Sequence, residues 1–184
     1  MLGNSFTYCN DLDKMLSALT GAEVVRNVRG GARLSEQLNP ATELGQKAKA
    51  LLTEKWDYVV LQEMSNGPIT EKESYMKSVS ALSSLARDCG AKPIIYSTWA
   101  YREGSEKLAS LGLSYSEMSD GLYKSCREAA GRYGCLVADV GRAFDVMRPL
   151  AELYVEDAYH PTPAGTLLAA ETIARVIEKD QSDG

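Results

Sequence analysis

A serine near the amino terminus and a histidine near the carboxyl terminus are the residues best suited to chemistry in this sequence. Ser5 stands in the run Gly-Asn-Ser, and His160 is the single histidine of the chain. Asp157 precedes that histidine by three residues. A hydroxyl, an imidazole and a carboxylate serve in acyl transfer as nucleophile, general base and orienter of the base. Any general-base histidine must be His160.

Groups that could stabilise an oxyanion follow two apolar runs of the chain. Gly31 comes after the weaker run, whereas Gln62 and Asn66 come after the run 58–61. Main-chain N–H groups beside glycines and side-chain amides stabilise the negative charge of a tetrahedral intermediate. In open parallel sheets, ligands bind beyond the carboxyl ends of the strands. The pattern therefore predicts that these donors meet the serine and the histidine at one sheet edge.

Apolar runs predict the strands that would position these groups, because buried parallel strands are continuously hydrophobic. The runs cover residues 58–61, 93–96 and 135–138, with a weaker one at 23–28. Another strand, before Gly-Asn-Ser, would have only Met1 and Leu2. A central strand usually has about five or six residues. Two interpretations stay open: the strand is short, or upstream residues, a targeting segment among them, are absent from this sequence.

Stripes of apolar residues at helical spacing alternate with the strands. They cover residues 44–55, 75–89, 115–133 and 169–177. This alternation predicts right-handed crossovers, a parallel sheet and helices on both faces. The length of 184 residues fits one domain, residues 1–184.

Short-range signals predict where several helices begin. Thr70 and Ser114 each have a glutamate three residues later, which is capping-box spacing. Thr162 precedes a proline, as an N-cap precedes a first-turn proline. A helix starting near Asn10 is expected to direct its positive end toward the site.

Composition excludes several classes of protein. Apolar residues make up 45% and charged residues 24%, as in a globular domain. No run approaches the roughly 18 apolar residues of a membrane span, and no signal peptide is visible, so the sequence as given predicts a cytoplasmic protein. The net charge of −5, without a basic stripe, argues against a nucleic-acid partner. Four scattered cysteines and one histidine favour neither a metal site nor a disulfide framework, and no cofactor is indicated.

The sequence blocks, taken together, resemble the SGNH (GDSL-like) hydrolases. Gly3-Asn4-Ser5 resembles the block with the nucleophile, Gly30-Gly31 the second block, and Asp157-x-x-His160-Pro161 the fifth. The strand 57–61 followed by Gln-Glu-Met-Ser resembles a little-characterised bacterial branch of that superfamily. The resemblance spans nearly the whole chain in the expected order. It implies a three-layer α/β/α sandwich on a flavodoxin-like parallel sheet of about five strands.

The resemblance also implies roles for individual residues. Ser5 would be the nucleophile, His160 the base, and Asp157 the orienter of the imidazole. Glu156 is the alternative orienter, and we favour Asp157. No metal is implied.

Four groups are candidates for the oxyanion hole. The resemblance implies the main-chain N–H groups of Ser5 and of Gly31, with the neighbouring Gly30 as the alternative to Gly31. Aligned with the third block, Asn66 would be the side-chain donor, while Gln62, nearer the strand end, could do the same by another geometry. The sequence leaves this choice open. Asn4 replaces the aspartate of the first block, which is not the catalytic acid of the family, so little loss is expected.

Tyr8, Trp99 and Tyr101 are candidates for lining a substrate pocket, with packing beneath a loop as the alternative. Glu63 is interpreted as a solvated loop carboxylate. The longest loop, 99–113, is of modest length, which favours a small or short-chain acyl group.

The resulting hypothesis is a serine esterase that forms an acyl-enzyme on Ser5, with a small-molecule or carbohydrate ester, such as an O-acetyl sugar, as substrate. Alternatives on the same site are an acyltransferase, a thioesterase or a lysophospholipase. Rivals from other classes are a non-catalytic glycan-binding module and a flavodoxin-like nucleotide or flavin binder. The sequence does not indicate an oligomeric state.

Overall fold

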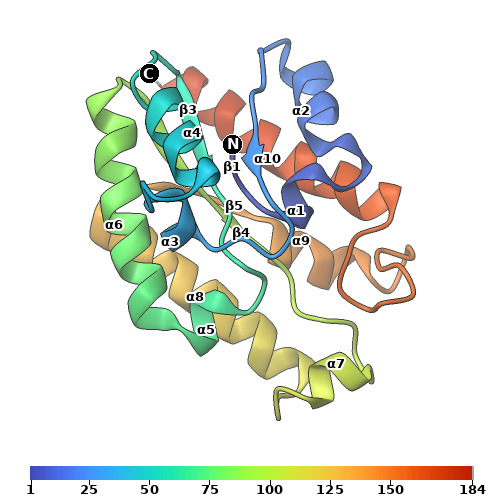
Figure 1. Ribbon diagram of the computed structural model, residues 1–184. Helices are drawn as coiled ribbons and strands as arrows, with labels where there is room; N and C mark the ends of the chain where they lie inside the picture. Colours follow the sequence, from blue (N-terminus) through green and yellow to red (C-terminus); the bar gives the residue numbers. More distant parts are fainter. Residues whose placement is uncertain (184) are drawn as a thin grey trace.

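The centre of the computed structural model, which describes residues 1–183, is a parallel sheet with the strand order β2-β1-β3-β4-β5 (Figure 1). All neighbouring strands pair in parallel, as predicted. The strands are β1 (Leu2–Gly3), β2 (Asn27–Val28), β3 (Tyr58–Leu61), β4 (Lys92–Ser97) and β5 (Leu136–Asp139). The predicted bounds of β3 are therefore confirmed, and those of β4 and β5 differ from the observed bounds by one residue at each end. Within the predicted run 23–28, only the last two residues form a strand.

Helices connect the strands and cover both faces of the sheet (Figure 1). They are α1 (Ser5–Tyr8), η1 (Cys9–Asp11), α2 (Leu12–Thr20), α3 (Leu34–Gln37), α4 (Glu43–Leu51), α5 (Gly67–Thr70), α6 (Lys72–Asp88), α7 (Glu106–Ala109), α8 (Tyr115–Tyr133), α9 (Val140–Met147) and α10 (Pro163–Asp183).

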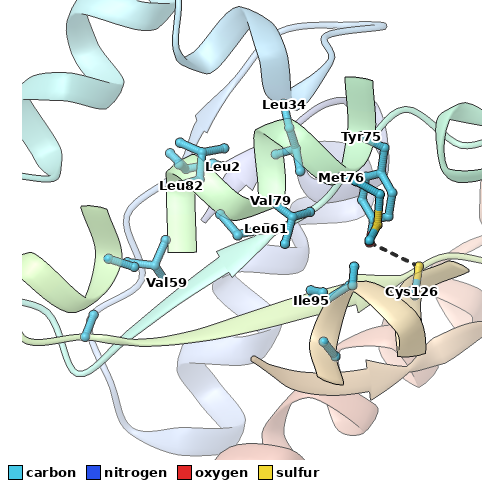
Figure 2. Packing of buried hydrophobic residues seen from close by; sticks show 14 of the residues in the cluster. Leu2, Leu34, Val59, Leu61, Tyr75, Met76, Val79, Leu82, Ile95 and Cys126 are labelled. Atoms are coloured by element: carbon cyan, nitrogen blue, oxygen red, sulfur yellow. Dashed lines mark hydrogen bonds between the residues drawn. The ribbon is translucent and has the colours of Figure 1, made fainter. Parts of the chain in front are cut away.

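Two apolar clusters on opposite faces of the sheet make the molecule a three-layer α/β/α sandwich. Successive side chains of a strand point to opposite faces. Val59 and Leu61 of β3 accordingly pack under α3, α4, α6 and α8, and Val60 packs with α1, α2, α9 and α10. Figure 2 shows part of the first cluster, in which Tyr75 also donates a hydrogen bond to the Sγ of Cys126 (3.5 Å). The sandwich predicted from the resemblance is confirmed.

The strand order places a topological switch point between β1 and β3. The chain crosses from β1 to β2 on one side and from β3 to β4 on the other. Loops after two such strands diverge, which leaves a crevice beyond their carboxyl ends. Ser5 follows β1 and Gln62 follows β3, so both lie at this crevice.

Of the predicted helix starts, those at Ser114 and Thr162 are confirmed, the one near Asn10 is displaced by two residues, and the one at Thr70 is wrong. Ser114 forms a complete capping box, and the Thr162 hydroxyl accepts from the N–H of Gly165 (3.2 Å). The helix expected near Asn10 is α2, which begins at Leu12 after left-handed backbone at Asn10, and the helix that begins at Ser5 is α1. Thr70 is the last residue of α5, a short helix that begins at Gly67, and α6 begins at Lys72.

Within residues 1–183, no helix combines the length and the apolar character needed to cross a membrane.

Truncating Leu82 in α6 tests the packing of this helix on the sheet. Leu82 is fully buried, so Leu82→Ala should lower the free energy of unfolding by about 2–5 kcal/mol. Leu85, one turn later, is 39% exposed, and Leu85→Ala should change the free energy of unfolding by less than about 1 kcal/mol. Urea unfolding of both variants measures the contrast, and equal losses would contradict the packing.

Candidate active site

The turn from β1 into α1 determines where Ser5 lies. Asn4 caps α1, because its Oδ1 accepts from the N–H of Phe6 (3.2 Å). Its Nδ2 donates to the carbonyl oxygen of Ala32 (3.0 Å) in the loop after β2. An aspartate could not make this second bond, since its carboxylate has no N–H. The asparagine of the first block therefore ties the turn of Ser5 to the neighbouring loop.

Gln62 holds the same turn by side-chain hydrogen bonds. Its Oε1 accepts from the N–H of Asn4 (2.9 Å) and from the hydroxyl of Thr7 (3.0 Å). Gly3 permits this approach, because a Cβ at that position would lie 2.6 Å from Oε1. The Nε2 of Gln62 donates to the carbonyl oxygen of Glu63. The side chain is fully buried and bound to protein, so the prediction of Gln62 as an oxyanion donor is wrong.

The loop before α10 brings Asp157 and His160 to Ser5. Oδ1 of Asp157 accepts from the main-chain N–H groups of Tyr159 (3.1 Å) and His160 (2.9 Å), which folds the loop back on itself. Oδ2 of Asp157 lies 2.6 Å from Nδ1 of His160. Nε2 of His160 lies 2.8 Å from Oγ of Ser5. Residues 155 positions apart in sequence thus form one hydrogen-bonded line.

Electrostatics keep the Asp157 carboxylate ionised. Partial burial acts to raise its pKa, but hydrogen bonds from the side chain and N–H of His160 and from the N–H of Tyr159 outweigh it, so the pKa is lowered from 3.8. Glu156 makes its contact through its carbonyl oxygen, which accepts from Arg102 (3.4 Å). The geometry therefore favours Asp157 over Glu156 as the carboxylate partner of the imidazole.

A left-handed segment connects α1 to the loop of His160. Asn10 (φ 53°) and Asp11 (φ 57°) both have positive φ, a conformation that costs non-glycine residues free energy. In this position, Nδ2 of Asn10 donates to the carbonyl oxygen of Pro161 (3.0 Å) and to the hydroxyl of Thr166 (2.8 Å). The segment that follows Ser5 is thereby bonded to the residue that follows His160. Sequence analysis missed this role, although asparagine is among the residues that tolerate left-handed backbone.

Aromatic rings pack beneath and beside the imidazole. Trp99 is fully buried and stacks between Phe6 (centroids 4.6 Å apart) and Phe144 (4.0 Å). The ring centroid of Tyr159 lies 4.1 Å from that of His160. The prediction that Trp99 lines a substrate pocket is wrong, because the ring is a core residue.

The other two aromatic candidates have different environments. Tyr101 is buried, and its hydroxyl is hydrogen-bonded to that of Ser65 (2.8 Å), so its predicted place in the pocket lining is also wrong. Tyr8 is 37% exposed and follows Ser5 by one helical turn. Its hydroxyl would lie 3.2 Å from a Cβ placed on Gly30. Of the three aromatic candidates, Tyr8 alone has substantial exposed surface beside the site.

The remaining oxyanion candidates differ from Gln62 in what they bind. Asn66 precedes α5, and its side-chain amide makes no hydrogen bond among residues 1–183; its Oδ1, which can only accept, is buried, so Nδ2 is the atom that could donate. Gly31 is exposed and has a φ of 66° in the turn after β2. Neither the N–H of Gly31 nor that of Ser5 donates to a group within the described part of the chain. These two N–H groups and the Nδ2 of Asn66 therefore have no donor role elsewhere in the described residues.

The interpretation of Glu63 as a solvated carboxylate is wrong. The side chain is 6% exposed and accepts from the N–H of Met64 (2.7 Å). Its place after a buried strand gave no signal that the carboxylate turns inward.

The four cysteines are free thiols, and within residues 1–183 no group of three or more His, Cys, Asp or Glu side chains is arranged to hold a metal ion.

The parallel α/β/α fold, with a serine, a histidine and an aspartate hydrogen-bonded in line at its carboxyl edge, is the architecture of a class of serine hydrolases.

Comparisons with known proteins identify the family. A solved structure from Slackia heliotrinireducens, described as "a putative SGNH hydrolase", is 47% identical in sequence, with a TM-score of 0.91 and 96% of each chain covered. The chain belongs to the SGNH hydrolases and is a hydrolase enzyme. No protein-family model matches it, and no curated protein matches it by sequence.

More distant structures share the fold. A DUF4886 family protein from Bacteroides uniformis is 20% identical, with a TM-score of 0.73, and 97% of this chain and 81% of that chain are covered. An acetylxylan esterase from Geobacillus stearothermophilus, solved as a catalytic variant, is 18% identical, with a TM-score of 0.65 and coverage of 96% and 91%.

Replacing Asp157 by asparagine tests the carboxylate–imidazole contact through stability. Because the pKa of Asp157 is lowered in the folded state, its stabilising effect is present above the unfolded value near 3.8 and lost as the pH falls through the folded value. The thermal midpoint of Asp157→Asn should therefore lie below that of the wild type at pH 6, and the difference should shrink as the pH falls below 3.8. A difference in thermal midpoint that grows toward acid pH would contradict the contact between the Asp157 carboxylate and the imidazole.

Proposed function

We propose that this hydrolase is a serine esterase that cleaves a carboxylic ester of a small or short acyl group through an acyl-enzyme on Ser5. The observation that carries the proposal is the hydrogen-bonded line from Ser5 through His160 to Asp157, with distances of 2.8 and 2.6 Å. A serine hydroxyl becomes an effective nucleophile when a base removes its proton during attack.

The proposed reaction has two halves. Oγ of Ser5 attacks the ester carbonyl carbon while Nε2 of His160 takes the hydroxyl proton, which gives a tetrahedral intermediate. The imidazolium then protonates the departing alcohol oxygen, and the acyl group stays on Ser5. Water, deprotonated by the same imidazole, attacks the acyl carbon; the bond to Oγ then breaks, the imidazolium returns its proton to Oγ of Ser5, and the acid is released. Asp157 holds the imidazole through Nδ1 and stabilises the imidazolium in both halves.

The oxyanion would be stabilised by the main-chain N–H groups of Ser5 and Gly31 and by the side-chain amide of Asn66. Of the two amides considered from sequence, the Nε2 of Gln62 donates to protein, whereas the Asn66 amide makes no hydrogen bond within residues 1–183. This difference supports Asn66. Losing one such donor typically lowers the rate about 100- to 1000-fold.

Two observations support a carbohydrate O-acetyl ester as the substrate. The side chains of Asp157 and His160 are 40% and 22% exposed, so the site is open enough for a bulky alcohol portion. The exposed ring of Tyr8 offers an apolar face beside Gly30, on which a sugar ring could pack. The fold is also that of an acetylxylan esterase, of which catalytic variants at a serine and at an aspartate have been solved.

Replacing Ser5 by alanine tests the proposed nucleophile. Ser5→Ala should abolish hydrolysis of p-nitrophenyl acetate, because within residues 1–183 no other hydroxyl is bonded to the imidazole of His160. The thermal midpoint should change little, since the partly exposed Ser5 hydroxyl lies outside the apolar core. Absorbance at the p-nitrophenolate band and calorimetry measure the two effects.

Butyrate and octanoate esters, assayed alongside, report the size of the acyl pocket, and acetate release from acetylated xylo-oligosaccharides tests the carbohydrate substrate. Wild-type turnover by Ser5→Ala would disprove the nucleophile assignment, and a preference for octanoate would disprove the short-acyl assignment.

A further inference from the structure

Glu63 is a buried carboxylate that the proposed reaction does not use. It follows Gln62 at the end of β3 and is 6% exposed. Oε1 accepts from the N–H of Met64 at 2.7 Å. The N–H of Leu34 lies 3.4 Å from Oε1 and 3.3 Å from Oε2, so it is shared between the two oxygens.

The N–H of Met64 lies in the loop of Asn66, and the N–H of Leu34 lies where the loop of Gly31 ends and α3 begins. Leu34 comes three residues after Gly31, and Met64 two residues before Asn66. The second loop also passes closely over the carboxylate, because a Cβ on Gly67 would lie 2.9 Å from Cγ of Glu63. One buried side chain is therefore bonded to both loops and packed against one of them.

The charges around Glu63 come from several elements. Arg33 at the start of α3 is attractive and Glu71 between α5 and α6 is repulsive, and these two side chains are paired with each other (2.6 Å). Tyr75 of α6 and Cys126 of α8 also face the carboxylate. Burial raises the pKa of Glu63, although the N–H groups of Met64 and Leu34 and the charge of Arg33 oppose the rise.

The direction of the pKa shift of Glu63 indicates whether the carboxylate stabilises the fold at neutral pH or instead positions other groups. A carboxylate whose pKa is raised by folding stabilises the fold below its unfolded pKa, near 4.5, and this effect is lost as the pH rises through the folded value. At neutral pH, a buried ionised group of this kind is weak support for stability. What it supplies is two directional hydrogen bonds.

We propose that Glu63 is a positioning residue whose carboxylate cross-links the loops of Gly31 and Asn66 and so sets the geometry of the oxyanion hole. The inference rests on the proposed function, because it assigns these two residues to that hole. Misplacing a catalytic donor by about 1 Å can lower the rate about 100-fold.

Glu63→Gln tests the cross-link with little change in shape. The amide keeps one acceptor oxygen and replaces the other by an NH₂ group, which cannot accept from a main-chain N–H. Glu73→Gln is the matched control, since it removes a nearby negative charge whose exposed side chain pairs with Lys77 of its own helix and with neither loop. Hydrogen exchange of residues 30–34 and 64–67 should become faster in Glu63→Gln and stay unchanged in the control.

Kinetics and stability complete the experiment, with p-nitrophenyl acetate as substrate. In Glu63→Gln, kcat should fall roughly 10- to 100-fold and KM should change by less than about threefold, because the hole acts on the transition state. The thermal midpoint of Glu63→Gln relative to wild type should rise between pH 4.5 and pH 8. A purely structural carboxylate would instead give parallel losses of kcat and midpoint at pH 8.

The outcomes separate the two claims. Unchanged exchange in either loop, wild-type kcat, or equal effects in Glu63→Gln and Glu73→Gln would each overturn the role of Glu63 and leave the esterase intact. If the wild type and Ser5→Ala both fail to hydrolyse any ester, the proposed function fails, and the exchange comparison still decides whether Glu63 joins the loops.

Discussion

The amide oxygen of Gln62, buried at the switch point of the sheet, is the interaction on which the geometry of the site depends. It binds the N–H of Asn4 and the hydroxyl of Thr7, one on either side of Ser5. Because the interior has a low effective dielectric constant, such bonds are strong and an unpaired partner there would be costly. Asn4 carries the constraint to the loop after β2 through Ala32. The position of the serine is thus determined by three strand ends together.

Local backbone strain accompanies this constraint. Within residues 1–183, the non-glycine residues with positive φ are Asn10, Asp11 and Ala158. The first two follow the helix of Ser5, and Ala158 (φ 70°) lies between the predicted orienter and the predicted base. Strain of this kind costs about 1–3 kcal/mol per residue and persists where surrounding contacts over-determine the conformation. Here, those contacts are the hydrogen bonds of Asn10 and the N–H of Arg102, which donates to the carbonyl oxygen of Ala158 (2.8 Å).

The parts that could be predicted from sequence are those that local physics determines. The continuous apolar run 58–61 is β3, and the capping box of Ser114 begins a helix as expected. The spacing of Asp157 and His160 suits the tight loop that joins them by hydrogen bonds. Their meeting with Ser5 required only that β1 and the loop before α10 end at the same edge of the sheet.

The errors concern the direction in which side chains point after a strand ends. Gln62, Glu63 and Trp99 all follow strands; a ligand-binding role was expected for Gln62 and Trp99 and solvent exposure for Glu63, yet all three turn inward. Trp99 does so because Phe6 and Phe144, distant in sequence, form a slot for its ring. Such tertiary partners leave no periodicity in the sequence that could reveal them.

Covalent labelling tests the central claim most directly. Wild type and His160→Ala would be treated with a fluorophosphonate, and the rate and place of modification followed by intact-protein and peptide mass spectrometry. The account predicts one adduct per chain, on the peptide containing Ser5, formed much more slowly in His160→Ala. Labelling of another residue, or equal rates in both proteins, would contradict the assignment of Ser5 and His160 as one catalytic unit.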